Sequence, residues 1–256
     1  MKKYIALIAY DGTDFSGWQE QPTAPTVAST LQKTFLKVFN QPITVIGASR
    51  TDAGVHALGQ IASFSCDLPL PPHAMKEAWN NRLPKSIFIR DISLAQPDFH
   101  PHKHVLQKTY YYHLFFNRPN PFTARFGWYY EFTKKVDFTK FEEALSLYHG
   151  EHDFTSFCRI EDKHKSPIRT IDHVSTILLP EYDALRIIIK GKSFLQFQIR
   201  RMIGYALDVA RRKDLPVCTI QDMLNNPNPQ QTLLKADGCG LCLRKVLYHD
   251  QTTMHK

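Results

Sequence analysis

Residues 3–48 read KYIALIAYDGTDFSGWQEQPTAPTVASTLQKTFLKVFNQPITVIGA, and this stretch sets the architecture of the N-terminal half. The apolar run from Lys3 to Tyr10 predicts a strand, and the turn residues 11–14 follow it. Thr26 predicts the N-cap of a helix, because apolar side chains follow it at helical spacing. These side chains are Val27, Leu31, Phe35 and Val38. The run Ile43 to Ala48 predicts a second strand.

Residues 49–92 add two strands and a helix to the elements predicted in residues 3–48. Gln60 to Cys66 predicts a third strand, and Pro71-Pro72 opens a helix that Pro84 ends. Ser86 to Ile92 predicts a fourth strand. The order β-α-β-β-α-β is that of a ferredoxin-like unit.

The second half nearly repeats this order after an extra leading strand at 109–116. The elements predicted after it are a strand at 126–132, a helix on Phe141, Ala144, Leu145 and Tyr148, strands at 171–179 and 185–190, helices at 193–212 and 219–225, and a final strand at 241–249. We therefore predict an α+β protein with domains at 1–104 and 105–256. We expect the two halves to join in one mostly antiparallel sheet with helices on one face.

Composition and charge narrow the class of protein. Hydrophobic residues make up 43% and charged residues 22%, which are ordinary globular values that exclude a disordered chain. No apolar run is long enough to span a bilayer, so we expect a cytoplasmic protein without a membrane partner. The 32 Lys and Arg against 24 Asp and Glu give a net charge of +8. This excess favours nucleic acid as a partner, although a basic charge that serves only solubility stays open.

The five cysteines do not suggest disulfides or a metal site. Their number is odd, and the single C-x-x-C pair, Cys239 and Cys242, lacks a second ligand pair at zinc-site spacing. We interpret this pair as structural and expect no metal.

The most informative segment is GASRTDAGVHA at 47–57, which lies between two predicted strands. Small residues and glycines around an acid and a base allow a ligand or another backbone to approach closely. Asp52 in this setting can serve as nucleophile, general acid or base, or metal ligand. The plainer alternative is an Asx-turn beside a solvated Arg50.

This segment resembles the signature of the tRNA pseudouridine synthase A family. Four other segments resemble that family in the same order along the chain: YDGTDFSGWQEQ at 10–21, KTYYY at 108–112, GEHDFTSF at 150–157 and FQIRRMIG at 197–204. The resemblance implies a cofactor-free homodimer that isomerises uridine in the tRNA anticodon stem-loop, at about positions 38 to 40.

The resemblance also implies roles for four residues. Asp52 matches the catalytic aspartate, and Arg200 matches the arginine that pairs with it. Tyr110 matches the tyrosine that packs against the target base, and Arg50 matches a basic residue near the RNA. By residue type alone, Tyr110 fits a sheet core and Arg200 a solvated helix flank equally well.

Two positions depart from the family pattern. Arg201 stands where a neutral residue such as Asn is expected, and Tyr111 stands where Arg is common. Both departures are expected to affect RNA contacts rather than the chemistry.

The chemistry of the implied reaction agrees with these residue types. Pseudouridine formation breaks the N1–C1′ bond, turns the uracil and rejoins it through C5, with no redox change and no outside atom. The chain has neither the P-loop nor the dinucleotide-binding glycine pattern. One carboxylate can begin the reaction by attacking the sugar, by attacking the base, or by removing a 2′ proton. A guanidinium keeps that acid ionised, and an aromatic face holds the turning base.

Further basic segments and two other function classes complete the sequence reading. The loops 159–169 and 117–125 are candidate RNA contacts, and His100, His102 and His104 are interpreted as linker residues that meet phosphate. A non-catalytic RNA-binding module would tolerate the loss of Asp52. A metal-dependent nuclease would need further carboxylates near Asp52 and would be sensitive to chelators.

Overall fold

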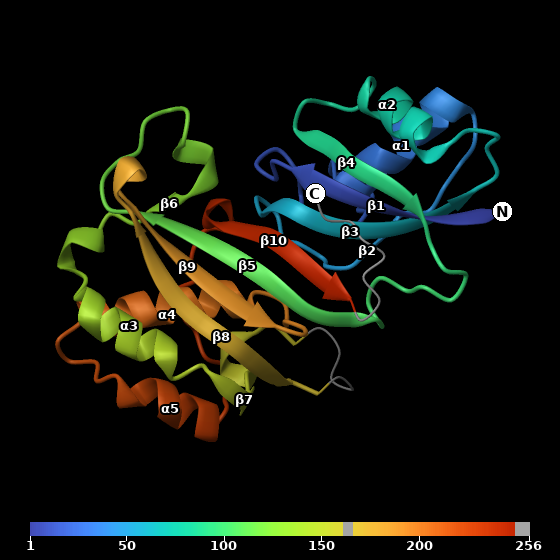
Figure 1. Cartoon of the computed structure of the whole chain (residues 1–256). Helices are drawn as coiled ribbons and strands as arrows, with labels where there is room; N and C mark the ends of the chain where they lie inside the picture. Colours follow the sequence, from blue (N-terminus) through green and yellow to red (C-terminus); the bar gives the residue numbers. More distant parts are fainter. Residues whose placement is uncertain (161–165, 249–256) are drawn as a thin grey trace. The chain divides into compact units, whose positions relative to one another are not determined.

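The computed structural model describes residues 1–160 and 166–248 and divides the chain into two compact units. One unit contains residues 1–106 together with the chain from Cys242 onwards, and the other contains residues 107–241. Helices and ten mostly antiparallel strands in the described residues confirm the predicted α+β class. Figure 1 shows the course of the chain through these elements.

The first unit contains the predicted β-α-β-β-α-β order and one additional strand. Strand β1 lies between β4 and β3, and both pairs are antiparallel. The elements are β1 (Lys2–Tyr10), α1 (Val27–Phe39), β2 (Ile46–Gly47), β3 (His56–Cys66), α2 (Pro72–Asn80), β4 (Ile87–Leu94) and β10 (Leu241–Tyr248).

An aromatic cluster joins the helices of this unit to its sheet. Thr26 caps α1 as predicted, in a reciprocal capping box with Ser29. Phe35 of α1 meets Trp79 of α2 edge to face, with ring centroids 4.8 Å apart. Both rings also contact Phe64 of β3, at 5.7 and 5.5 Å. Helices α1 and α2 thus cover one face of the sheet (Figure 1).

Two strands, β2 and β10, pair with one edge of the long strand β3. Ile46 and Gly47 of β2 pair antiparallel with Ser63 and Ala62 near its end. Cys242 and Leu243 of β10 pair in parallel with His56 and Ala57 at its start. The strand predicted at 43–48 is therefore only two residues long. The parallel pairing also brings the last strand into the first unit, whereas the predicted division assigned it to the second domain.

The strands of the second unit follow the order β5-β9-β8-β7 with antiparallel neighbours, and β6 pairs in parallel with β5. Helices α3 and α4 pack on each other, and α3 contacts β8. The elements are β5 (Val105–Phe115), β6 (Trp128–Tyr129), α3 (Phe138–Ser146), β7 (Gly150–Asp153), β8 (Ile168–Leu179), β9 (Ala184–Gly191), α4 (Gln198–Arg211) and α5 (Cys218–Asn225).

Two predicted elements differ in this unit, and one strand was not predicted. The strand predicted at 126–132 contains only the two residues of β6, because 3-10 turns at Ala124–Phe126 and Thr133–Lys135 flank it. The helix predicted from 193 begins at Gln198, because Phe197 before it is left-handed (φ 64°). The four-residue strand β7 was not predicted. His249, the predicted end of the last strand, lies outside the described residues.

Among the helices of residues 1–160 and 166–248, none has the length and apolar character needed to cross a membrane.

Candidate active site

The segment 48–55 is a loop that joins the end of β2 to the start of β3. β10 pairs with this first part of β3, and β2 pairs with a later part of it. Thr51 and Val55 are buried in it, Asp52 is half-buried, and Arg50 and Ala53 are exposed. Gly54 has a φ of 75°, which only glycine adopts readily, and Val55 N donates to Asp52 O at 3.2 Å. The turn therefore places the half-buried Asp52 between the buried Thr51 and the exposed Ala53.

The N-terminal motif 10–21 clamps this loop through the backbone. Trp18 N donates to Thr51 O at 3.0 Å, and Gly54 N donates to Phe15 O at 3.3 Å. Gly17 has a φ of 91°, and a Cβ added there would lie 2.6 Å from Thr51 O. The two motifs with the closest family resemblance are therefore parts of one structure.

Buried side chains fix the first half of the loop. The Gln60 amide exchanges two hydrogen bonds with the backbone of Ser49, at 3.1 and 2.7 Å. The Tyr10 hydroxyl is 2.8 Å from the Thr51 hydroxyl. Since Gln60 and Tyr10 lie on neighbouring strands, the sheet itself determines where the loop starts and turns.

His56 serves the other end of the loop. Gly12 N lies 3.0 Å from its Nδ1, and the Asp11 carboxylate lies 3.2 Å from the same nitrogen. One imidazole nitrogen cannot both accept from an amide and donate to a carboxylate. The amide hydrogen is permanent and Asp11 already accepts twice from Thr13, so we assign Nδ1 as the acceptor.

These supporting residues had no role in the sequence reading. Trp18, Gly17 and Gly12 stand in a motif that was noticed for its resemblance, but a contact with the loop needs the tertiary structure. His56 belongs to the family-like segment 47–57, but no role was predicted for it, and Gln60 lies on β3 outside every quoted motif.

In the second unit, Tyr110 lies on β5 opposite Ile189 of β9. It is only 5% exposed, and Phe194, from the loop between β9 and α4, meets its ring edge to face at 5.2 Å. Tyr112 points to the same face, is fully buried and donates to Asp237 O at 3.0 Å. Burial raises the pKa of Tyr112 well above its ordinary value, so it remains a neutral structural donor.

Lys108 lies two residues before Tyr110 on the same face of β5. Its side chain is buried, and burial lowers its pKa to about 8. A buried amine of this kind is unusual in a sheet core and is typical of functional sites. Lys108 stands in the family-like segment 108–112, but its residue type and position predicted no role for it.

Arg200 lies in the first turn of α4 and is only 9% exposed. Its Nε donates to Ala236 O at 2.8 Å, and Ala236 N donates to Arg200 O at 3.0 Å. The guanidinium carbon lies 5.6 Å from the centre of the Phe197 ring. The interpretation of Arg200 as a solvated helix flank is therefore wrong, because the segment around Ala236 covers it.

The two departures from the family pattern have local partners. A terminal nitrogen of Arg201 donates to Cys158 O and thereby ties the start of α4 to the end of the segment 150–157. The Arg186 guanidinium lies 4.7 Å above the ring of Tyr111 on the opposite face of β5 from Tyr110. Both side chains are thus engaged within the second unit.

The structure divides the predicted site residues between the two units. Arg50 and Asp52 share one loop of the first unit, while Tyr110 and Arg200 lie in the second. The contact of Arg200 with Asp52 stays a prediction.

The other sequence candidates are less informative. The three histidines at 100, 102 and 104 lie in turns rather than on a strand. The Nδ1 atoms of His100 and His104 each accept a hydrogen bond from a backbone amide of this segment. Cys239 is half-buried and Cys242 is buried. Residues 161–165 of the predicted RNA-contacting loop lie outside the described residues. In the described part of the chain, no group of three metal-ligating side chains comes together.

Comparison with known proteins identifies the class. The family of tRNA pseudouridine synthases matches residues 6–106 and 144–249. A tRNA pseudouridine synthase A of Thermodesulfovibrio yellowstonii is 34% identical over 251 residues, covering 94% of this chain and 97% of that protein. A tRNA pseudouridine synthase A of Streptococcus equi subsp. equi is 34% identical over 252 residues, covering 98% of this chain and 100% of that protein.

The chain therefore belongs to the tRNA pseudouridine synthase family. It is an isomerase that converts uridine to pseudouridine in tRNA.

Proposed function

We propose that the target uridines lie in the anticodon stem-loop of tRNA, at about positions 38 to 40. The support is the agreement of five motifs, in order, with the synthase A branch and the same name on full-length relatives. Mapping of pseudouridine at nucleotide resolution, in tRNA from cells with and without this protein, tests the positions. Loss of pseudouridine elsewhere in tRNA, with positions 38 to 40 unchanged, would refute them.

We assign Asp52 as the catalytic group. The observation that carries this assignment is a half-buried carboxylate on a loop that is fixed at Ser49, Thr51 and Gly54. Such fixation holds the acid in one orientation before the substrate arrives, which is how a preorganised site lowers a barrier. Asp52 then begins the reaction at the sugar, at the base or at the 2′ position, since each route needs one ionised carboxylate.

Arg200 and Tyr110 complete the proposed machinery. The Nε of Arg200 already donates to Ala236 O. A bidentate contact with Asp52 would therefore use the two terminal guanidinium nitrogens of Arg200. That contact would keep Asp52 ionised. Tyr110, held by Phe194, offers a ring against which the released uracil turns.

RNA binding follows from charge. The net charge of +8 and the exposed Arg50 support contacts with phosphate, so affinity for tRNA should fall steeply between 50 and 200 mM salt, by about 10³-fold or more. An affinity that stays flat over this range would contradict the basic RNA site. We further propose a cytoplasmic homodimer, which sedimentation of the full chain with and without tRNA tests.

The decisive experiment uses tRNA that carries tritium at C5 of uridine. The new bond forms at C5, so the wild-type protein should release tritium to water without added metal or nucleotide. Asp52→Asn preserves side-chain size but removes the charge, and it should abolish release while leaving the unfolding temperature nearly unchanged. Asp98→Asn, at an exposed position far along the chain, is the matched control.

Two outcomes would overturn the assignment of Asp52. One is undiminished tritium release from Asp52→Asn. The other is wild-type release that a chelator abolishes, which would instead favour a metal-dependent reaction.

A further inference from the structure

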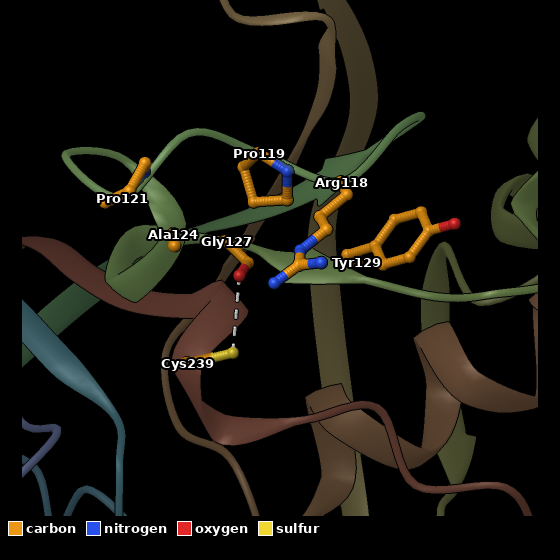
Figure 2. A pocket seen from close by; sticks show the side chains of 7 residues that line it. All are labelled: Arg118, Pro119, Pro121, Ala124, Gly127, Tyr129 and Cys239. Atoms are coloured by element: carbon orange, nitrogen blue, oxygen red, sulfur yellow. Dashed lines mark hydrogen bonds between the residues drawn. The ribbon is translucent and has the colours of Figure 1, made fainter.

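A surface hollow of the second unit lies between the segment that joins β5 to α3 and the 3-10 turn at Gly238–Gly240. It has a volume of about 530 Å³, within the usual range of small-molecule sites of roughly 300–1,000 Å³. Its walls include Arg118, Pro119, Pro121, Ala124, Tyr129 and Cys239. Figure 2 shows the Arg118 guanidinium extending into this hollow, with the ring of Tyr129 beside it.

The walls are held in place by local hydrogen bonds. Asn120 organises the first turn, because its side chain accepts from Phe122 N at 3.0 Å and its carbonyl accepts from Ala124 N at 3.0 Å. The thiol of Cys239 donates to Gly127 O at 3.3 Å, as the dashed line in Figure 2 marks. A ligand would therefore meet a preformed site.

Gly127 and Cys239 define the floor of the hollow. A Cβ at Gly127 would lie 2.4 Å from the Phe115 ring, so only glycine lets the chain lie this close to β5. Burial raises the pKa of Cys239 to about 12, and the thiol is therefore neutral at physiological pH. The Asp237 carboxylate, which accepts from Cys239 N at 3.0 Å, adds to this rise in pKa.

Three aromatic side chains of the segment 117–130, which forms most of the walls, remain in contact with solvent. Phe122 is 93% exposed, Phe126 47% and Tyr129 39%. One exposed aromatic is ordinary, but three within eight residues of an ordered loop mark an interaction surface. Flat rings beside an arginine are the usual means by which proteins hold unpaired bases.

The charge of the segment selects the partner. Residues 117–130 contain Arg118 and Arg125 and no acidic residue. A second copy of the chain, placed on this surface by a two-fold axis, would bring the same arginines toward each other. An RNA strand supplies both the negative charge and the unpaired bases.

We propose that this hollow is an accessory RNA site that takes one unpaired nucleotide of the tRNA substrate. The base lies against Tyr129 and Pro119, and a flanking phosphate binds Arg118. The proposal requires only that tRNA is the substrate, and it holds whichever uridines are modified.

Binding of unmodified tRNA to three variants tests this site. Tyr129→Ala should raise the Kd about 10-fold or more through lost stacking, and Tyr129→Phe should recover most of that loss. Arg118→Gln should raise the Kd and reduce the slope of log affinity against log salt by about one. The matched control is Arg82→Gln, an exposed arginine after α2 that loses the same charge. For each variant the KM of tritium release should rise in step with the Kd.

Cross-linking identifies the occupant directly. A benzophenone amino acid in place of Phe122, an exposed position that tolerates the change, should cross-link to tRNA on irradiation. Kd values equal to that of Arg82→Gln, or a cross-link to a second copy of this chain, would overturn the proposal. If Tyr129→Ala unfolds, Arg118→Gln and the cross-link decide the matter. A wild-type protein that releases no tritium would refute the proposed function instead.

Discussion

The two units hold their proposed site residues by different means. In the first unit, Asp52 lies on an irregular loop that is fixed by backbone contacts with Gly17, Trp18 and Phe15. In the second unit, Tyr110 and Arg200 lie on a regular strand and a regular helix. A side chain on a helix or strand is placed by local geometry, while a loop side chain depends on close approach of distant backbone. The position of Asp52 should therefore be lost when an added side chain fills the space between its loop and the neighbouring backbone. The role of Tyr110 or Arg200 should be lost when that side chain itself is replaced.

The largest effect is expected at the regular helix. Arg200→Lys removes the planar fork and the Nε donor to Ala236 O, so kcat/KM for tritium release should fall by about 10²- to 10³-fold. Arg201→Lys, one residue on, gives up a single contact with Cys158 O and is the matched control. Equal losses in the two variants would show that Arg200 supports only the fold of α4.

The next effect tests the clamped loop. Gly17→Ala places a methyl 2.6 Å from Thr51 O at a positive φ, so the loop must shift and kcat should fall by about 10²-fold. The free energy of unfolding should fall by about 1–3 kcal/mol.

Gly150→Ala is the control for Gly17→Ala. Gly150 also has a positive φ of 104°, but the nearest atom to its added Cβ is 3.5 Å away. Gly150→Ala should therefore lower the free energy of unfolding through backbone strain but leave kcat unchanged. If both variants lose turnover equally, backbone strain and not contact with the loop explains the result.

A smaller effect concerns stability and pH in the second unit. Burial lowers the pKa of Lys108 to about 8 from 10.5, so the folded state binds fewer protons than the unfolded state between these values. The contribution of Lys108 to the free energy of unfolding therefore rises as the pH increases from about 8 to 10.5, and it is lowest below about pH 8. Lys108→Met should stabilise the protein by about 2–3 kcal/mol at pH 7, and the gain should fade by about pH 10.5.

Chemical denaturation at pH 7, 9 and 10.5 measures this gain, with Lys190→Met on the neighbouring strand as the control. No gain at pH 7 would show that the partners of Lys108 offset its burial. A gain in stability with a loss of turnover would show that the reaction needs the amine.

The smallest effect compares two thiols. Cys218 is exposed, whereas burial raises the pKa of Cys239 to about 12. Iodoacetamide at pH 8 should therefore modify Cys218 and leave Cys239 nearly unreacted, as mass spectrometry of peptides would show. Rapid modification of Cys239 would mean that the floor of the hollow opens readily.

By itself, the sequence determined the β-α-β-β-α-β order of the first unit, the cap of α1 at Thr26 and the family. Each of these depends on neighbours in the chain: apolar spacing, a capping hydroxyl, or a contiguous motif. Apolar spacing failed at 126–132 and at 193–197, where single residues such as Phe197 adopt conformations that the pattern does not encode.

Only the tertiary structure decided how the site residues are held. The clamp of motif 10–21 on the loop at Asp52, the cover of Arg200 by Ala236 and the burial of Lys108 all join residues far apart in the chain. The return of β10 to the edge of β3 has the same origin. Contacts of this kind depend on which surfaces meet after the chain has folded, and residue type or spacing along the sequence does not specify them.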